Sequence, residues 1–248
     1  MIFRILCVLL SAAVLPASAA ETYPLTIGNV TLEVPIPEGY VAASESEEHY
    51  QTLKFQQGAQ GNEVLAVFVP AERTNTEDDY NHALGIAMLR KFRDRDCTKE
   101  ELEYARREMN DKIAPMADKV GQQAGVAVSA QPIHDFSDRH FSFSMRLAVP
   151  GKEGCTVTSM ALIRGRMWYF FAQNGEGASP EDLIGVKEIS KNWLGSIIAN
   201  NPSDEATLAR ENSDGLLSFT YTGAIAGAIA GAVIGLVVKL TKKSPRRR

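Results

Sequence analysis

The sequence contains none of the short motifs that mark the common catalytic sites. It has no GxSxG nucleophile elbow, no HExxH zinc helix, no GxxxxGK[ST] phosphate loop and no GxGxxG dinucleotide loop. Residues 21–215 also contain no internal repeat and no low-complexity stretch. The sequence therefore assigns no reaction, and it predicts neither a cofactor nor a metal ion.

One long segment near the C-terminus contains no charged residue, and the segment that follows it contains no acidic residue. Residues 216–238 are 23 positions without a charged side chain, and the tail 239–248 contains six basic residues and no acid. At about 1.5 Å per residue, such a helix reaches about 34 Å and crosses a hydrocarbon core of about 30 Å. Because basic residues stay on the cytoplasmic side, we expect one span with a cytoplasmic C-terminus.

The first twenty residues predict the same orientation. Arg4 precedes the apolar run 5–14, and small residues at 17–20 suit a cleavage site. This pattern is typical of a secretory signal peptide. An uncleaved anchor or a short buried helix is the alternative for this segment. We expect a protein of the inner (plasma) membrane of a bacterial envelope, with a periplasmic N-terminal domain.

The segment between the two ends is poor in basic residues. Of 26 Lys and Arg residues, 19 lie within 21–215, together with all 30 Asp and Glu residues. The resulting net charge of about −11 argues against nucleic acid as a partner, because nucleic-acid binding requires a basic face. The expected partners are membrane lipids, which attract the basic tail, and a second transmembrane helix.

Glycine is concentrated in the predicted span. Four glycines recur every fourth residue, and a four-residue period drifts only about 40° per repeat around a helix. One face then consists almost wholly of small residues, while Ile225, Ile229 and Val233 lie opposite. Such a face permits close helix–helix approach in a membrane. The segment resembles the glycine-zipper pattern, which implies packing with itself or with another protein. The predicted packing residues are Gly223, Gly227, Gly231, Gly235, Ala224, Ala228 and Ala232.

Residues 21–199 predict an extracytoplasmic α+β domain. Alternating or apolar runs indicate strands at 29–34, 50–56, 63–69, 141–149, 156–163 and 166–173. Helices are expected at 76–92, from Thr98 with Glu101 in a capping box, and from Ser179. Pro115 should end or kink the second of these helices. Residues 200–215 read as a polar linker. This order predicts an antiparallel sheet packed with helices, and it resembles the PsbP/Mog1-type α/β/α domains, a resemblance that implies a fold and no functional residue.

Cysteine is scarce, since only Cys97 and Cys155 follow the signal peptide. An even pair on the oxidising side of a membrane favours a disulfide. Two free thiols, or a role in metal binding or catalysis, are the alternatives.

The densest cluster of polar residues lies ahead of the 141–149 strand. His134, Asp135, Asp138 and His140 offer two imidazoles and two carboxylates, which suit acid–base chemistry or metal binding. Asp and Ser also commonly shape turns before strands. The cluster is therefore a candidate site, with a role in shaping the turn as the alternative.

Three functional hypotheses follow. The first is a single-pass envelope protein whose acidic domain binds or scaffolds and whose transmembrane helix associates. The second is a membrane-tethered hydrolase with a site at residues 134–140. The third treats the apolar tail as a cleaved sorting signal, although no LPxTG-like site precedes it.

Overall fold

The computed structural model describes residues 21–213, apart from residues 48, 49, 52, 55–57, 59, 60, 73–80 and 150. The predicted signal peptide, the predicted span 216–238 and the basic tail lie outside the described residues. Within the part of the chain that is described, no helix has the length and apolar character that a membrane crossing requires.

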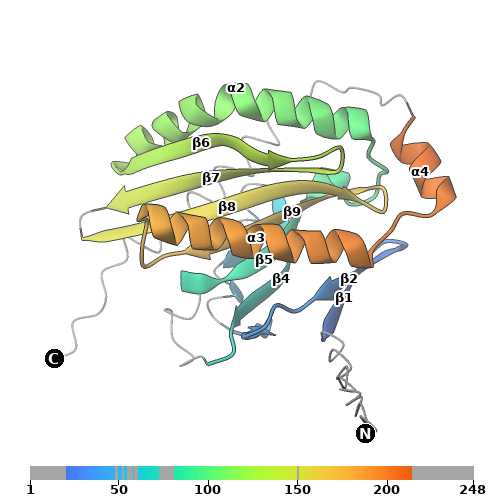
Figure 1. Cartoon of the computed structure of the whole chain (residues 1–248), viewed down its shortest axis with the longest axis horizontal. Helices are drawn as coiled ribbons and strands as arrows, with labels where there is room; N and C mark the ends of the chain where they lie inside the picture. Colours follow the sequence, from blue (N-terminus) through green and yellow to red (C-terminus); the bar gives the residue numbers. More distant parts are fainter. Residues whose placement is uncertain are drawn as a thin grey trace, which may run out of the picture.

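A seven-stranded antiparallel sheet forms the centre of the domain (Figure 1). Its strands, in spatial order, are β3 (Tyr40–Ala42), β4 (Asn62–Pro70), β5 (Leu84–Leu89), β9 (Arg166–Asn174), β8 (Lys152–Ile163), β7 (His140–Val149) and β6 (Ala127–Phe136). A separate hairpin consists of β1 (Thr22–Ile27) and β2 (Val30–Pro35).

The long helix α2 (Lys99–Ala124) covers one face of the sheet (Figure 1). The capping box is present: Thr98 Oγ1 accepts from Glu101 N at 3.3 Å, and Thr98 N donates to Glu101 Oε2 at 3.0 Å. One stripe of α2 packs on alternate residues of β7, with Phe141, Phe143, Met145 and Leu147 on the sheet side and Leu102, Ala105, Met109 and Ile113 on the helix side. The period-two pattern of 141–149 therefore points half of its side chains at α2.

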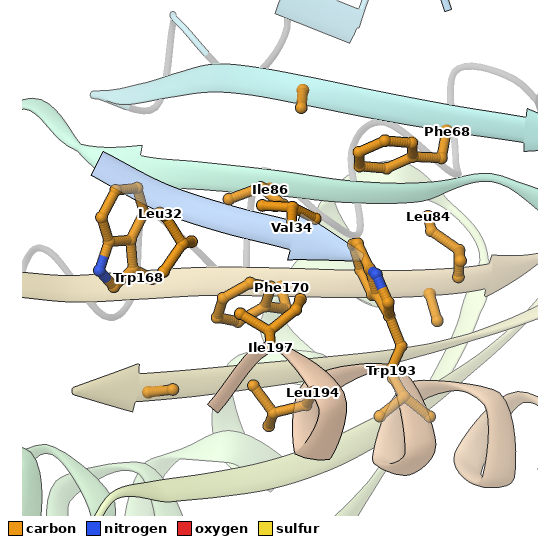
Figure 2. Packing of buried hydrophobic residues seen from close by; sticks show 14 of the residues in the cluster. Leu32, Val34, Phe68, Leu84, Ile86, Trp168, Phe170, Trp193, Leu194 and Ile197 are labelled. Carbon is orange, nitrogen blue, oxygen red and sulfur yellow. The ribbon is translucent and has the colours of Figure 1, made fainter. Parts of the chain in front are cut away.

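Helix α3 (Pro180–Asn200) and the β1–β2 hairpin cover the opposite face. Figure 2 shows Trp193 of α3 reaching into the cluster of Leu32, Val34, Phe68 and Phe170. The Trp193 ring lies edge-on to Phe68 and to Phe170, with centroids 5.7 and 5.8 Å away. Its Nε1 donates to the Pro35 carbonyl at 2.9 Å, so this side chain ties α3 to the hairpin. The domain is thus an α+β fold with helices on both faces of an antiparallel sheet.

The sequence prediction of a helix at 76–92 is wrong for the residues that are described. Residues 84–89 form strand β5, followed by one 3₁₀ turn, η2 (Arg90–Phe92). All six residues of β5 are buried, because a central strand is covered on both faces. Such a strand lacks the polar alternation that identifies a half-buried strand. Gly85 leaves room for the Phe171 ring, which occupies the place of a β-carbon.

Three further expectations differ from the structure. Residues 50, 51, 53 and 54, predicted as a strand, are helical. Pro115 does not end α2, which runs on to Ala124. The predicted polar linker 200–215 contains a short helix, α4 (Glu205–Glu211), whose N-cap is Asp204. The predicted strands at 29–34, 63–69, 141–149, 156–163 and 166–173 and the helix after Ser179 are confirmed as β2, β4, β7, β8, β9 and α3.

Candidate functional site

Four segments that are distant in sequence meet beside α4, at one end of the sheet (Figure 1). They are the β1–β2 turn, the loop before α2, the β8–β9 turn and α4. Together they line an open hollow of about 480 Å³, which we call the arginine pocket. Its lining residues are Asn29, Val30, Thr31, Asp96, Arg164, Arg166, Asp204, Thr207 and Arg210.

Asp96 organises two of the three guanidinium groups. Its Oδ1 pairs with Arg166 Nη1, and its Oδ2 lies 3.2 Å from Arg210 Nε. Arg166 Nη2 also donates to Asn29 Oδ1 at 3.3 Å, and Arg210 Nη2 donates to Thr207 Oγ1 at 2.9 Å. The side chains are therefore held in place by the protein before any ligand arrives.

Arg166 is the most unusual member of the pocket. Only 6% of its surface is exposed, and its Nε is buried without a hydrogen-bond partner among the described residues. A buried polar atom without a partner carries a free-energy cost.

The β8–β9 turn presents the third arginine. Ile163 pairs with Arg166, so Arg164 and Gly165 form a two-residue loop, with φ of +52° and +73°. Such a turn favours Asn-Gly, because both positions adopt the left-handed conformation. The side chain of Arg164 donates through Nη1 to the Thr31 carbonyl at 2.6 Å, on the hairpin across the pocket.

A buried carboxylate fixes α4 to the turns that surround the pocket. Glu211 is fully buried, and its Oε1 accepts from Gly165 N at 2.8 Å and from Ser203 Oγ at 2.9 Å. Its Oε2 accepts from Arg139 Nη2 at 2.7 Å, in the β6–β7 turn. The position of Arg210, the neighbouring residue, therefore depends on this contact.

The arginine pocket suits an anionic group. A guanidinium carries five N–H donors, and the contacts above leave donors unused on all three arginines. Arginine recognises carboxylates and phosphates through paired N–H donors. With three arginines and two aspartates the lining is positive by one charge, although the domain as a whole is acidic.

The structure brings together only part of the His–Asp cluster predicted from sequence. His140 Nε2 lies 3.5 Å from Asp135 Oδ2, and His140 Nδ1 is 2.9 Å from Ser137 Oγ. Asp138 instead pairs with Lys99 at the start of α2, at 2.7 Å. Ser137 Oγ also accepts from Arg139 N at 3.1 Å, so these polar contacts shape the β6–β7 turn.

His134 lies on edge strand β6. Partial burial lowers its pKa to about 4, and the nearby Lys187 adds to this effect against the opposing charge of Asp135. Its imidazole is therefore neutral at physiological pH. Among the described residues no three His, Cys, Asp or Glu side chains gather in a way that holds a metal ion.

The disulfide favoured by the sequence does not form. Cys97 and Cys155 are free and buried, in the clusters on opposite faces of the sheet. Cys97 N bonds to the Gly165 carbonyl at one end of β8, while Cys155 lies eight residues from Ile163 along that strand. Eight strand residues span about 27 Å, and a disulfide requires Cα atoms within about 7 Å. Burial raises the pKa of both thiols to about 11.

The sequence analysis missed the arginine pocket, and the predicted packing residues Gly223 to Gly235 lie outside the described residues. The available signal was the Arg164-Gly165-Arg166 sequence, in which an arginine stands where a tight hairpin favours asparagine. Asp96 and Arg210 carry no such signal, because only the tertiary fold brings them to the turn.

No protein-family model matches this chain, and no curated protein matches it. Among solved structures, the chain is similar to the Ran-binding protein Mog1p of Saccharomyces cerevisiae. The identity is 10%, the alignment covers 77% of this chain and 99% of that chain, and the TM-score is 0.39. A likeness at this level transfers neither a ligand nor a partner.

Proposed function

We propose that residues 21–213 form an extracytoplasmic binding domain, that residues 216–238 hold it in the inner (plasma) membrane, and that the arginine pocket is its ligand site for an anionic group. The observation that carries the ligand site is the convergence of three arginines, Arg164, Arg166 and Arg210, on one pocket. No catalytic arrangement is needed for such a site, and binding is the activity that this chemistry supports.

Ligand binding is tested by thermal unfolding of the full chain in detergent, with phosphate or chloride at equal ionic strength. An anion that binds the folded state raises the unfolding midpoint. We expect phosphate to raise it in the wild type and not in Arg166→Gln. Arg107→Gln, an exposed arginine of α2, is the matched control and should behave as the wild type. Equal responses of all three proteins would contradict the assignment of the pocket.

The membrane tether is tested separately in cells. Protease added to spheroplasts should digest the domain and spare a tag at the C-terminus. A photo-crosslinking residue at Ala228, on the small-residue face, should give a product, whereas one at Ile229 should not. The mass of the product distinguishes a homo-oligomer from a foreign partner. Chain that lacks the residues beyond 215 in intact-mass analysis would instead indicate processing of the tail.

The hydrolase alternative depends on the residues of the β6–β7 turn. The Ser137–His140–Asp135 contacts contain the residue types of a catalytic triad, but Ser137 Oγ also serves the turn by accepting from a backbone amide. Variants His134→Ala and His140→Ala decide this alternative, because loss of a phenotype-linked activity would support it and full tolerance of both would remove it.

We also propose that the fold is a PsbP/Mog1-like α/β/α sandwich. The support is the arrangement of α2 on one face of the antiparallel sheet and α3 on the other (Figure 1). An experimental structure that superposes on such domains over the whole sheet, in the same strand order, would bear this out.

A further inference from the structure

The arginine pocket lies close in sequence to the predicted membrane entry. Arg210 lines the pocket, and Glu211, the last residue of α4, precedes position 216 by five residues. Five residues span at most about 18 Å when fully extended. Glu211 fixes α4 to the β8–β9 and β6–β7 turns. The short connection to position 216 therefore keeps the pocket, as well as α4, near the bilayer surface.

The bilayer surface presents phosphodiester groups at that distance. A headgroup layer is about 5–8 Å thick on each side of the hydrocarbon core. A phosphodiester carries one negative charge and oxygen acceptors that match paired guanidinium donors. The pocket lining carries one net positive charge, and its volume of about 480 Å³ is larger than a phosphate group. The remaining space and the Asp204 carboxylate on its rim suit the polar remainder of a headgroup.

From this placement and chemistry we infer that the arginine pocket binds the phosphodiester of a phospholipid headgroup in the outer leaflet of the membrane that anchors the chain. This inference rests on the proposed function, because it requires residues 216–238 to span the membrane. Arg166 and Arg210, both held by Asp96, contact the phosphate, and Arg164 closes the site from the β8–β9 turn.

The test is native mass spectrometry of the full chain, released from nanodiscs of defined phospholipid. We expect the wild type to retain a phospholipid, and the double variant Arg164→Gln/Arg210→Gln to retain it at least about tenfold less. The Arg210 side chain is 52% exposed, and Arg164 is an exposed residue of the β8–β9 turn. This variant therefore leaves the core intact. Arg107→Gln is the control and should retain lipid as the wild type does. Unchanged retention in the double variant would overturn the inference.

The source of the phosphate is distinguished by competition. Glycerol 3-phosphate and inorganic phosphate carry the same group without acyl chains. If either displaces the lipid or binds equally well to lipid-free protein in detergent, then the ligand is a soluble phosphate and the membrane part of the inference is wrong. We expect the lipid to remain bound in the presence of both.

Failure of the tether and failure of the pocket give different results. If the proposed span is wrong, alkaline carbonate releases the wild-type chain from membranes. If only the pocket inference is wrong, the chain resists carbonate and the double variant keeps its lipid.

Arg164→Asn gives the sharpest single comparison. Asparagine suits the left-handed turn position better than arginine does, but the substitution also removes the hydrogen bond from Arg164 Nη1 to the Thr31 carbonyl. A purely structural role therefore predicts a small net change in stability and unchanged lipid retention. We expect an unfolding midpoint close to that of the wild type together with reduced lipid retention. Unchanged retention would show that the Arg164 side chain does not contact the ligand.

Discussion

Single side chains hold the end of the domain that carries the arginine pocket, and the buried carboxylate of Glu211 accepts three hydrogen bonds there. It joins α4 to the backbone of Gly165 and to Arg139. Removing one partner of a buried charge pair is costly, because the other is left without compensation. Arg139 retains 19% exposure of its side chain, which reduces that cost.

We therefore expect Glu211→Gln to lower the free energy of unfolding by about 2 kcal/mol. Urea unfolding of the full chain in detergent measures this change. Glu188→Gln, an exposed residue of α3, is the control and should change it by less than about 0.5 kcal/mol. A double-mutant cycle with Arg139→Gln isolates the pair. A coupling energy near zero would mean that the Gly165 and Ser203 contacts alone carry the effect.

The low pKa of His134 makes stability depend on pH in a defined direction. The folded-state pKa is about 4, against an ordinary value of 6.5, so the unfolded chain binds the proton more readily. The contribution of His134 is complete above pH of about 6.5 and is lost as the pH falls from there toward about 4. We expect wild type to lose more stability than His134→Gln between neutral pH and pH of about 5. Parallel losses in the two proteins would contradict the shifted pKa.

Among the elements, helix α2 contains a proline that the sequence analysis expected to end or kink it. Pro115 is exposed within the helix, and it offers no N–H to the carbonyl of Asp111. The helix continues because its buried stripe resumes beyond the proline, with Ala117 in the core. Tertiary packing therefore outweighs a local preference against helix.

Pro115→Ala should stabilise the protein by about 1–3 kcal/mol, since alanine restores the hydrogen bond and is the best helix former. The greater freedom of the unfolded chain offsets part of this gain. The midpoint of urea unfolding measures the change. Asp118→Ala, exposed in the same helix, reports the effect of helix propensity alone and should shift the midpoint less. An equal or lower midpoint for Pro115→Ala would mean that the proline fits the helix without strain.

The sheet as a whole decides the state of the two cysteines. It separates Cys97 from Cys155 by layer and by most of the length of β8. Burial also raises the pKa of both thiols to about 11, which keeps them in the unreactive protonated form.

We expect the chain from residue 21 onward to give almost no reaction with a thiol reagent at neutral pH. After unfolding without reductant, two thiols should react. Intact-mass analysis after alkylation counts them. If the two cysteines were alkylated only after reduction, they would form a disulfide, and the arrangement of the sheet would have to differ from the one described.

The sequence by itself determined the elements with strong local signals. The capping residues of α2 and α3 and the alternating strands of the second half of the chain depend on neighbours within a few positions, so they could be predicted. The α+β class follows from their order. The predicted signal peptide and span are likewise local patterns, and they stay predictions.

Only the tertiary structure decided the remainder. Strand β5 is extended because it lies inside the sheet, although the sequence pattern there was interpreted as helical. The His–Asp cluster, dense in sequence, became part of a turn. The arginine pocket combines Asp96, Arg166 and Arg210 from a loop, a strand and a helix. Contacts between such distant positions leave no periodic trace in one sequence, because each side chain is placed by the packing of its element.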